Sequence, residues 1–151
     1  EAITGLDLVR EQIRVAEGRG LSVRQDQVQL KGHAIECRIN AEDPRTFAPS
    51  PGTVQSYHAP GGMAVRVDSG LYTGYRVPPY YDSMIAKLIV YGSDREGCIR
   101  RLRRALEEFV ITGMKTTIPL HQRLIEDREF QAGAYTIKWL EEWLGRPENQ
   151  G

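Results

Sequence analysis

The residues best suited to chemistry stand in residues 32–44, which read GHAIECRINAEDP. Successive side chains of a strand point to opposite faces, so Glu36, Arg38 and Asn40 share one face while mostly apolar neighbours share the other. A guanidinium placed between a carboxylate and an amide is a cation with a fork of donors, suited to stabilising an oxygen that becomes negative during a reaction. The alternative is an ordinary strand with one solvent-facing side.

The common catalytic signatures are absent from the rest of the sequence. There is no Gly-x-x-x-x-Gly-Lys-Ser/Thr loop and no Gly-x-Gly-x-x-Gly segment, so no phosphate-binding loop is predicted. His33, His58 and His121 are scattered without the spacing of metal ligands, and we expect no metal site. Ser50 and Ser83 lack the surroundings of a nucleophilic serine, so the sequence does not indicate a hydrolase.

Length and composition favour a single globular domain. The chain has 151 residues, with 20 Lys and Arg against 20 Asp and Glu, so no overall charge attracts a nucleic acid or a membrane surface. Cys37 and Cys98 form no metal or redox spacing, which predicts reduced, buried thiols in a cytoplasmic protein. No apolar run approaches the roughly 20 residues of a membrane span. Because the sequence starts at Glu1 without Met, we expect a piece of a longer protein.

An arginine-rich stretch, RRLRR at residues 100–104, raises nucleic-acid binding as a second possibility. Glu96, Glu107 and Glu108 lie in the same predicted helix, and no aromatic residues alternate with the arginines. A solvated helix face is the better interpretation.

Hydrophobic periodicity and turn residues predict the elements that must position these groups. Residues 21–31 form a connector, and the run 83–91 is apolar enough for a central strand. A helix capped by Thr4 or Asp7 and ending before Gly18 places its apolar residues on one stripe, namely Leu6, Val9, Ile13 and Ala16. Strands are predicted at 33–40, 53–58 and 63–68, the last two joined as a hairpin. Three further helices are predicted: one capped by Ser93 or Asp94 with Ile99, Leu102, Leu106 and Phe109 inward, one from Thr117 that packs Leu120, Leu124 and Ile125, and one from Thr136 to Leu144 that packs Ile137, Leu140 and Leu144 with Trp139 or Trp143 beside them. This order indicates an α+β fold, an antiparallel β-sheet with flanking helices.

Four segments together resemble the C-terminal domain of biotin carboxylase. They are GHAIECRINAEDP at 32–44, PSPG at 49–52, HAPGG at 58–62 and VPPYYDSMIAKL at 77–88. The resemblance runs from Glu1 to about Leu144 and includes Thr112-Gly113-x-Lys115-Thr116. It implies the fold of that domain and membership of the ATP-grasp enzymes, which use MgATP and bicarbonate to carboxylate a ureido nitrogen of biotin on a carrier protein.

The resemblance also implies roles for particular residues. Arg38 matches the arginine that stabilises the enolate-like biotin anion. Glu36, Asn40 and Asp82 are expected to bind biotin or orient the guanidinium, with plain solvation or sheet hydrogen bonding as the alternative for the first two. Ile137 matches a position near the adenine of ATP, with helix core as its alternative. No metal ligand is expected in this chain, because the groups that bind ATP and Mg²⁺ lie upstream in the family.

The domain organisation and partners follow from the same resemblance. Residues 1–30 are expected to be a helix and connector from the end of the ATP-grasp region, 31–146 the C-terminal domain and 147–151 a tail. The expected partners are the missing ATP-grasp half, a biotin carboxyl carrier protein or domain, a carboxyltransferase component as in acetyl-CoA carboxylase, and a second copy contacted near Met63 and Arg66. The fragment alone is expected to be inactive, and the alternative function is a non-catalytic protein-interaction module.

Overall fold

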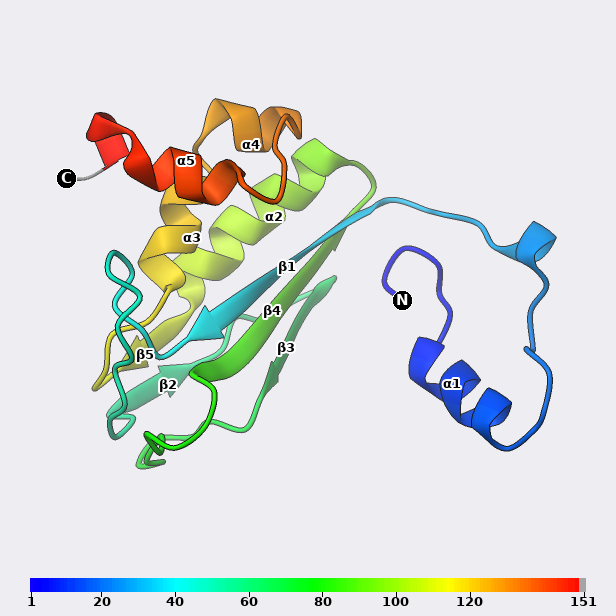
Figure 1. Ribbon diagram of the computed structural model, residues 1–151, viewed down its shortest axis with the longest axis horizontal. Coiled ribbons are helices and arrows are strands. Elements are labelled where there is room, and N and C mark those ends of the chain that lie inside the picture. The colour runs from blue at the N-terminus through cyan, green and yellow to red at the C-terminus, as the bar shows by residue number, and fades with distance from the viewer. Residues whose placement is uncertain (150–151) are drawn as a thin grey trace.

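The computed structural model describes residues 1–149. Its main body is a three-stranded sheet with helices against one face, and the segment that carries the first helix is set apart at the other side of the sheet (Figure 1). The helices are α1 (Leu8–Ala16), α2 (Arg95–Glu108), α3 (Ile118–Leu124), α4 (Arg128–Ala132) and α5 (Trp139–Gly145), with 3-10 turns η1 (Gln25–Gln27) and η2 (Pro147–Asn149). The strands are β1 (His33–Asn40), β2 (Ser56–His58), β3 (Val65–Ser69), β4 (Met84–Gly92) and β5 (Val110–Thr112). No helix within residues 1–149 is both long and apolar enough to cross a membrane.

The main sheet has the strand order β1-β4-β3, with both pairs antiparallel. Cys37 lies opposite Leu88 and Arg38 lies opposite Lys87. The alternation predicted for β1 is confirmed, because Cys37 and Ile39 are buried while Glu36 and Arg38 are exposed. An α+β fold with antiparallel strands and flanking helices is therefore confirmed.

Helix α2 covers the buried face of this sheet and forms the core with it (Figure 1). Asp94 begins the helix, since its Oδ1 accepts a hydrogen bond of 2.7 Å from the amide of Gly97. The helix buries the residues that its periodicity predicted, together with Cys98, and packs them against Cys37 and the apolar side of β4; these residues are Ile99, Leu102, Leu106 and the following Phe109. Cys37 and Cys98 are buried free thiols, as expected.

The predicted hairpin between residues 53–58 and 63–68 is wrong. β2 pairs with β5 in a separate two-stranded sheet, and β3 pairs with β4, with Val67 opposite Leu88. β2 and β5 have three residues each, which are too few to give a period-two signal in the sequence. The rings of Tyr57 and Phe109 meet edge to face at 6.1 Å, so β2 is held by the chain that leaves α2 rather than by β3.

The C-terminal helices contain two further departures from the predictions. Helix α4 was not predicted; Asp127 caps it by accepting from the amides of Glu129 and Phe130, and Gly133 ends it with φ of +73°. Ile137 was predicted to pack in the last helix, but it lies before α5 and is 100% exposed. The rest of that prediction is confirmed, because Trp139 and Trp143 are buried and Leu140 and Leu144 pack against them.

Helix α1 is capped by Asp7, which accepts a 2.9 Å hydrogen bond from the amide of Arg10. The predicted apolar stripe exists but is not covered. Val9 is 59% exposed and Ile13 is 56% exposed, and no residue of α1 is buried. The helix therefore presents an apolar surface that residues 1–149 leave open.

Candidate functional site

Arg38 stands on the open face of β1, directly opposite Lys87 of β4. Its side chain is 73% exposed, and its Nε lies 3.4 Å from Oε1 of Glu36. Neither Nη group makes a hydrogen bond within residues 1–149. The guanidinium therefore keeps most of its donors available for an oxygen of another molecule.

The neighbouring strands extend this site into a charged face. Nζ of Lys87 lies 3.9 Å from Oδ2 of Asp68, and Arg66 donates to both oxygens of Asp68 at 2.7 and 2.9 Å. The bond from Arg66 lowers the pKa of Asp68, so this carboxylate stays ionised. Because Arg66 already occupies Asp68, Lys87 is only weakly paired and adds positive potential beside Arg38.

Of the two residues predicted to flank Arg38, the structure brings only Glu36 into contact with it. The side chain of Asn40 does not contact Arg38, because a register shift between Ile39 and Asn40 interrupts the alternation of β1. Its Nδ2 donates to Oε1 of Glu42 at 3.2 Å, and the hydroxyl of Ser83 donates to the same oxygen. The Oδ1 of Asn40 is buried and has no partner among residues 1–149.

Asp82 lies at the same end of the sheet but does not contact Arg38. Its Oδ1 accepts a 2.8 Å hydrogen bond from the amide of Met84, which starts β4 opposite Asn40. The preceding Tyr80 and Tyr81 are strongly exposed. Asp82 therefore shapes the turn into β4, and an exposed aromatic pair stands next to it.

Sequence reasoning missed two residues that support Arg38 from behind. Thr117 and His121, at the start of α3 and one turn further, both hydrogen-bond to the carbonyl oxygen of Arg38, at 3.2 and 2.8 Å. Burial lowers the pKa of His121, which favours a neutral imidazole. No local pattern relates these positions to Arg38, because the chain makes the contact across 79 and 83 residues.

Ile137, the expected adenine contact, is fully exposed ahead of α5 and takes no part in the cluster around Arg38. Nothing within residues 1–149 covers its side chain. The helix-core alternative for Ile137 is wrong.

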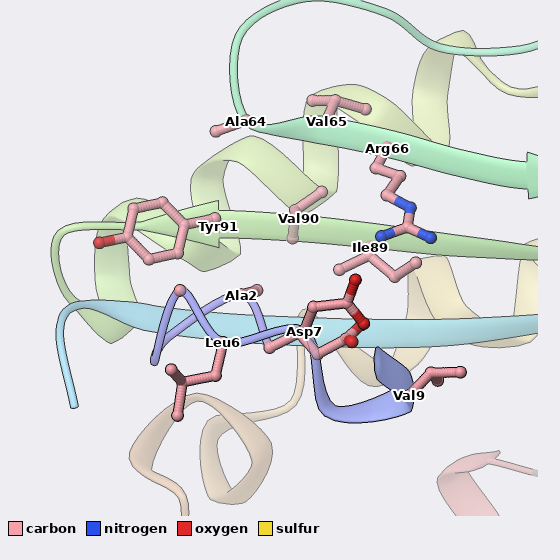
Figure 2. Close-up of a pocket in the computed structure, with 12 residues that line it drawn as sticks. Ala2, Leu6, Asp7, Val9, Ala64, Val65, Arg66, Ile89, Val90 and Tyr91 are labelled. Atoms are coloured by element: carbon pink, nitrogen blue, oxygen red, sulfur yellow. The ribbon is translucent and has the colours of Figure 1, made fainter. Parts of the chain in front are cut away.

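A separate hollow of about 780 Å³ lies between the N-terminal segment and strands β3 and β4. Figure 2 shows Arg66 and Ile89 on the sheet side of this hollow, and Leu6, Asp7 and Val9 on the other side. Its lining mixes apolar side chains with the charged groups of Glu1, Asp7 and Arg66. Met63, on the loop before β3, is 90% exposed.

Each of the four arginines in the stretch 100–104 of α2 has a partner within the molecule. Arg100 pairs with Glu96, Arg101 donates to the carbonyl of Tyr91, Arg103 donates to Glu126 at 2.6 and 3.1 Å, and Arg104 donates to Glu108 at 2.7 Å and to the carbonyl of Gly61 at 3.0 Å.

Comparison with known proteins supplies a family for this arrangement. A family model described as "Biotin carboxylase C-terminal domain" matches residues 36–142. The biotin carboxylase of Haemophilus influenzae is 58% identical over 148 residues, which are 98% of this chain and 33% of that protein. Biotin carboxylase 1 of Bacillus subtilis is 56% identical over 142 residues, covering 93% of this chain and 32% of the relative.

Solved structures agree with these relatives. The biotin carboxylase domain dimer of the Hydrogenobacter thermophilus 2-oxoglutarate carboxylase, in complex with MgADP, ADP and bicarbonate, matches with a TM-score of 0.88 and 49% identity. That match covers 93% of this chain and 31% of the other. Rhizobium etli pyruvate carboxylase matches with a TM-score of 0.87 and 30% identity, covering 95% of this chain and 15% of the other. The chain thus spans about a third of the length of the curated relatives cited here.

Proposed function

This chain belongs to the family of biotin carboxylase C-terminal domains, and on that premise we propose that it is the C-terminal part of an enzyme that carboxylates carrier-bound biotin with MgATP and bicarbonate. The observation that carries the proposal is the placement of Arg38. Its guanidinium stands on the open face of β1, with both Nη groups available and a second cation, Lys87, on the next strand.

In the proposed reaction, the γ-phosphoryl group of ATP passes to bicarbonate, which gives ADP and carboxyphosphate, and the C–O bond of carboxyphosphate then breaks to give CO₂ and phosphate. The released phosphate takes the proton from the ureido nitrogen of biotin, negative charge moves onto the ureido oxygen, and the nitrogen forms a bond to the carbon of CO₂. Arg38 donates hydrogen bonds to that oxygen while it is negative, which lowers the barrier for removing the proton. Glu36 contacts only Nε, at 3.4 Å, which leaves both Nη groups available to donate to that oxygen.

The other expected site residues enter the proposal with narrower roles. Asp82 and Asn40 would form the wall of the biotin site at the start of β4, without holding the guanidinium. Ile137 would lie against the adenine of ATP. We assign the phosphates and Mg²⁺ to groups outside this chain, in an ATP-grasp region that residues 1–30 would complete, with 31–146 forming the C-terminal domain and 147–149 the start of its tail.

The proposed partners follow from the same activity. A biotin carboxyl carrier protein or domain would present biotin to Arg38, and a carboxyltransferase component would take the carboxyl group onward, as in acetyl-CoA carboxylase. A second copy would contact the surface near Met63 and Arg66. The dimer described for the Hydrogenobacter thermophilus domain supports this last point. We also propose that the enzyme works in the cytoplasm.

The test uses a full-length enzyme in which this chain replaces the C-terminal third of the Haemophilus influenzae relative, of which it covers 33%. ADP release is measured with MgATP and bicarbonate, with and without free biotin. Arg38→Ala should lower the biotin-dependent rate by about a hundredfold or more, since one donor to a developing oxyanion contributes about 3–4 kcal/mol. Arg38→Lys should recover little, because an ammonium lacks the planar fork.

Two controls separate this loss from damage to the fold. ATP binding should persist in Arg38→Ala, and Arg128→Ala, at the exposed start of α4, should keep the full rate. An unchanged biotin-dependent rate in Arg38→Ala would remove Arg38 from the chemistry. A chimera that folds and binds ATP but shows no biotin-dependent rate would instead favour an interaction module.

A further inference from the structure

The outer edge of β1 is closed at Arg38 and Asn40 by the first turn of α3. β1 is the edge strand of its sheet, with β4 on one side and no strand on the other within residues 1–149. There Thr117 replaces a partner strand: its amide donates to the carbonyl of Asn40 at 3.1 Å, and its hydroxyl accepts from the amide of Asn40 at 2.9 Å. The same hydroxyl donates to the carbonyl of Arg38 at 3.2 Å. Thr117 therefore binds the backbone on both sides of Ile39.

His121 adds a second donor to the same carbonyl. Its Nε2 lies 2.8 Å from the carbonyl oxygen of Arg38. A carbonyl oxygen can only accept, so His121 must carry hydrogen on Nε2. Thr117 is buried and His121 is half-buried against the sheet edge, which gives both side chains little freedom to leave.

These bonds act at the point where β1 stops being regular. The register shift of β1 falls between Ile39 and Asn40, one residue beyond Arg38. A shift of this kind redirects neighbouring side chains, so the direction of the Arg38 side chain depends on how the two flanking peptide groups are held. Glu36 contacts only Nε, at the long distance of 3.4 Å, which leaves the backbone as the main determinant of where the guanidinium lies.

From this geometry we infer that Thr117 and His121 are positioning residues for Arg38. They hold its carbonyl and the following peptide against α3, and thereby set the place of the guanidinium relative to the ureido oxygen of biotin. The inference rests on the proposed function. Because a displacement of about 1 Å can cost up to about a hundredfold in rate, loss of one of these bonds is expected to cost about tenfold.

The experiment measures biotin-dependent ADP release in the full-length chimera. Thr117→Val removes the hydroxyl at nearly constant shape, and His121→Leu removes the imidazole donor. Each should lower the biotin-dependent kcat about tenfold, while the KM for ATP and the biotin-independent ATP hydrolysis remain unchanged. Thr117→Ser and His121→Gln restore a donor at the same place, and should return to within about threefold of the wild-type rate.

A double substitution distinguishes positioning from a general structural effect. If Thr117 acts through Arg38, Thr117→Val should have no further effect on the residual rate of Arg38→Ala, because the two changes remove one interaction. A tenfold drop that persists in the Arg38→Ala background would overturn the inference. So would a wild-type kcat in Thr117→Val or His121→Leu.

Two further measurements keep the inference testable. If Thr117→Val or His121→Leu does not fold, His121→Gln is compared with His121→Asn, whose amide is too short to reach the carbonyl; equal rates for these two variants would overturn the inference. The proposed function fails by a different result. In that case the wild-type chimera would show no biotin-dependent rate, or Arg38→Ala would keep the wild-type biotin-dependent rate.

Discussion

Arg95 joins the short helix α4 to the sheet, and its replacement by Met should loosen the C-terminal helices. Its Nε donates to the carbonyl of Gln131 at 3.0 Å, another nitrogen donates to the carbonyl of Phe130, and Nη1 lies 3.0 Å from Nε2 of His33. The guanidinium carbon also lies 5.3 Å from the centre of the Phe130 ring. Helix α4 has five residues and cannot be stable alone, so these contacts hold it in place.

The expected cost follows from those contacts. Two hydrogen bonds from a charged donor to backbone carbonyls contribute about 1 kcal/mol each at a half-buried position, and the contact with the ring adds about 0.5–1 kcal/mol. Arg95→Met keeps the aliphatic stem and should lower the free energy of unfolding by about 2–3 kcal/mol. With an m-value of about 2 kcal/mol/M, the urea midpoint should fall by about 1–1.5 M.

The assay is urea denaturation of the chain, followed by circular dichroism and by tryptophan fluorescence. Both tryptophans, Trp139 and Trp143, lie in α5 next to α4, so fluorescence reports the C-terminal helices. In Arg95→Met the fluorescence transition should precede the circular dichroism transition. Arg100→Met is the matched control, because Arg100 is exposed on the same helix and pairs only with Glu96 among residues 1–149. Equal midpoints for the two variants would refute the reasoning.

Three further results are expected. Burial raises the pKa of the Cys37 thiol to about 12, so iodoacetamide should modify this thiol at pH 8 only after unfolding. The free energy of unfolding should fall as the pH rises from about 8.5 toward 12, because in that range only the unfolded chain loses the thiol proton. Burial lowers the pKa of His121, so stability should fall as pH drops below about 6.5, and His121→Gln should reduce that loss in acid denaturation curves. Gly92→Ala should destabilise the chain in thermal unfolding, because a Cβ there would meet the amide of Cys98 at 2.5 Å, whereas Gly20→Ala, with nothing within 4 Å, should not.

The elements whose contacts are local could be predicted well from the sequence. The buried and exposed faces of β1, the cap at Asp94 and the inward face of α2 all agree with the structure. Each depends on the preference of a side chain for core or solvent and on a repeat of 2 or 3.6 residues, which a few neighbouring residues reveal. Arg38 could be selected for the same reason, because its alternation within β1 already separates it from the core.

The departures occur where chain segments distant in sequence compete. The sequence pattern placed Asn40 beside Arg38, but the register shift at the end of β1 turns its amide to Glu42. β2 pairs with β5 rather than with β3, because α2 brings the residues that follow it back beside β2. A strand of three residues carries no sequence pattern that would reveal this pairing. Ile137 is apolar at a helical spacing, yet it stays in solvent because α5 begins after it.

By itself, therefore, the sequence determined which residues of β1 and α2 face the core and which present charge, and it carried a family resemblance long enough to suggest the reaction. Only the tertiary structure decided which groups meet Arg38. Its carbonyl is bound by Thr117 and His121 across 79 and 83 residues, and its open face is shared with Lys87 of another strand. The physical reason is that hydrogen bonds between distant segments depend on where the folded chain brings them together, and no short repeat in the sequence records that position.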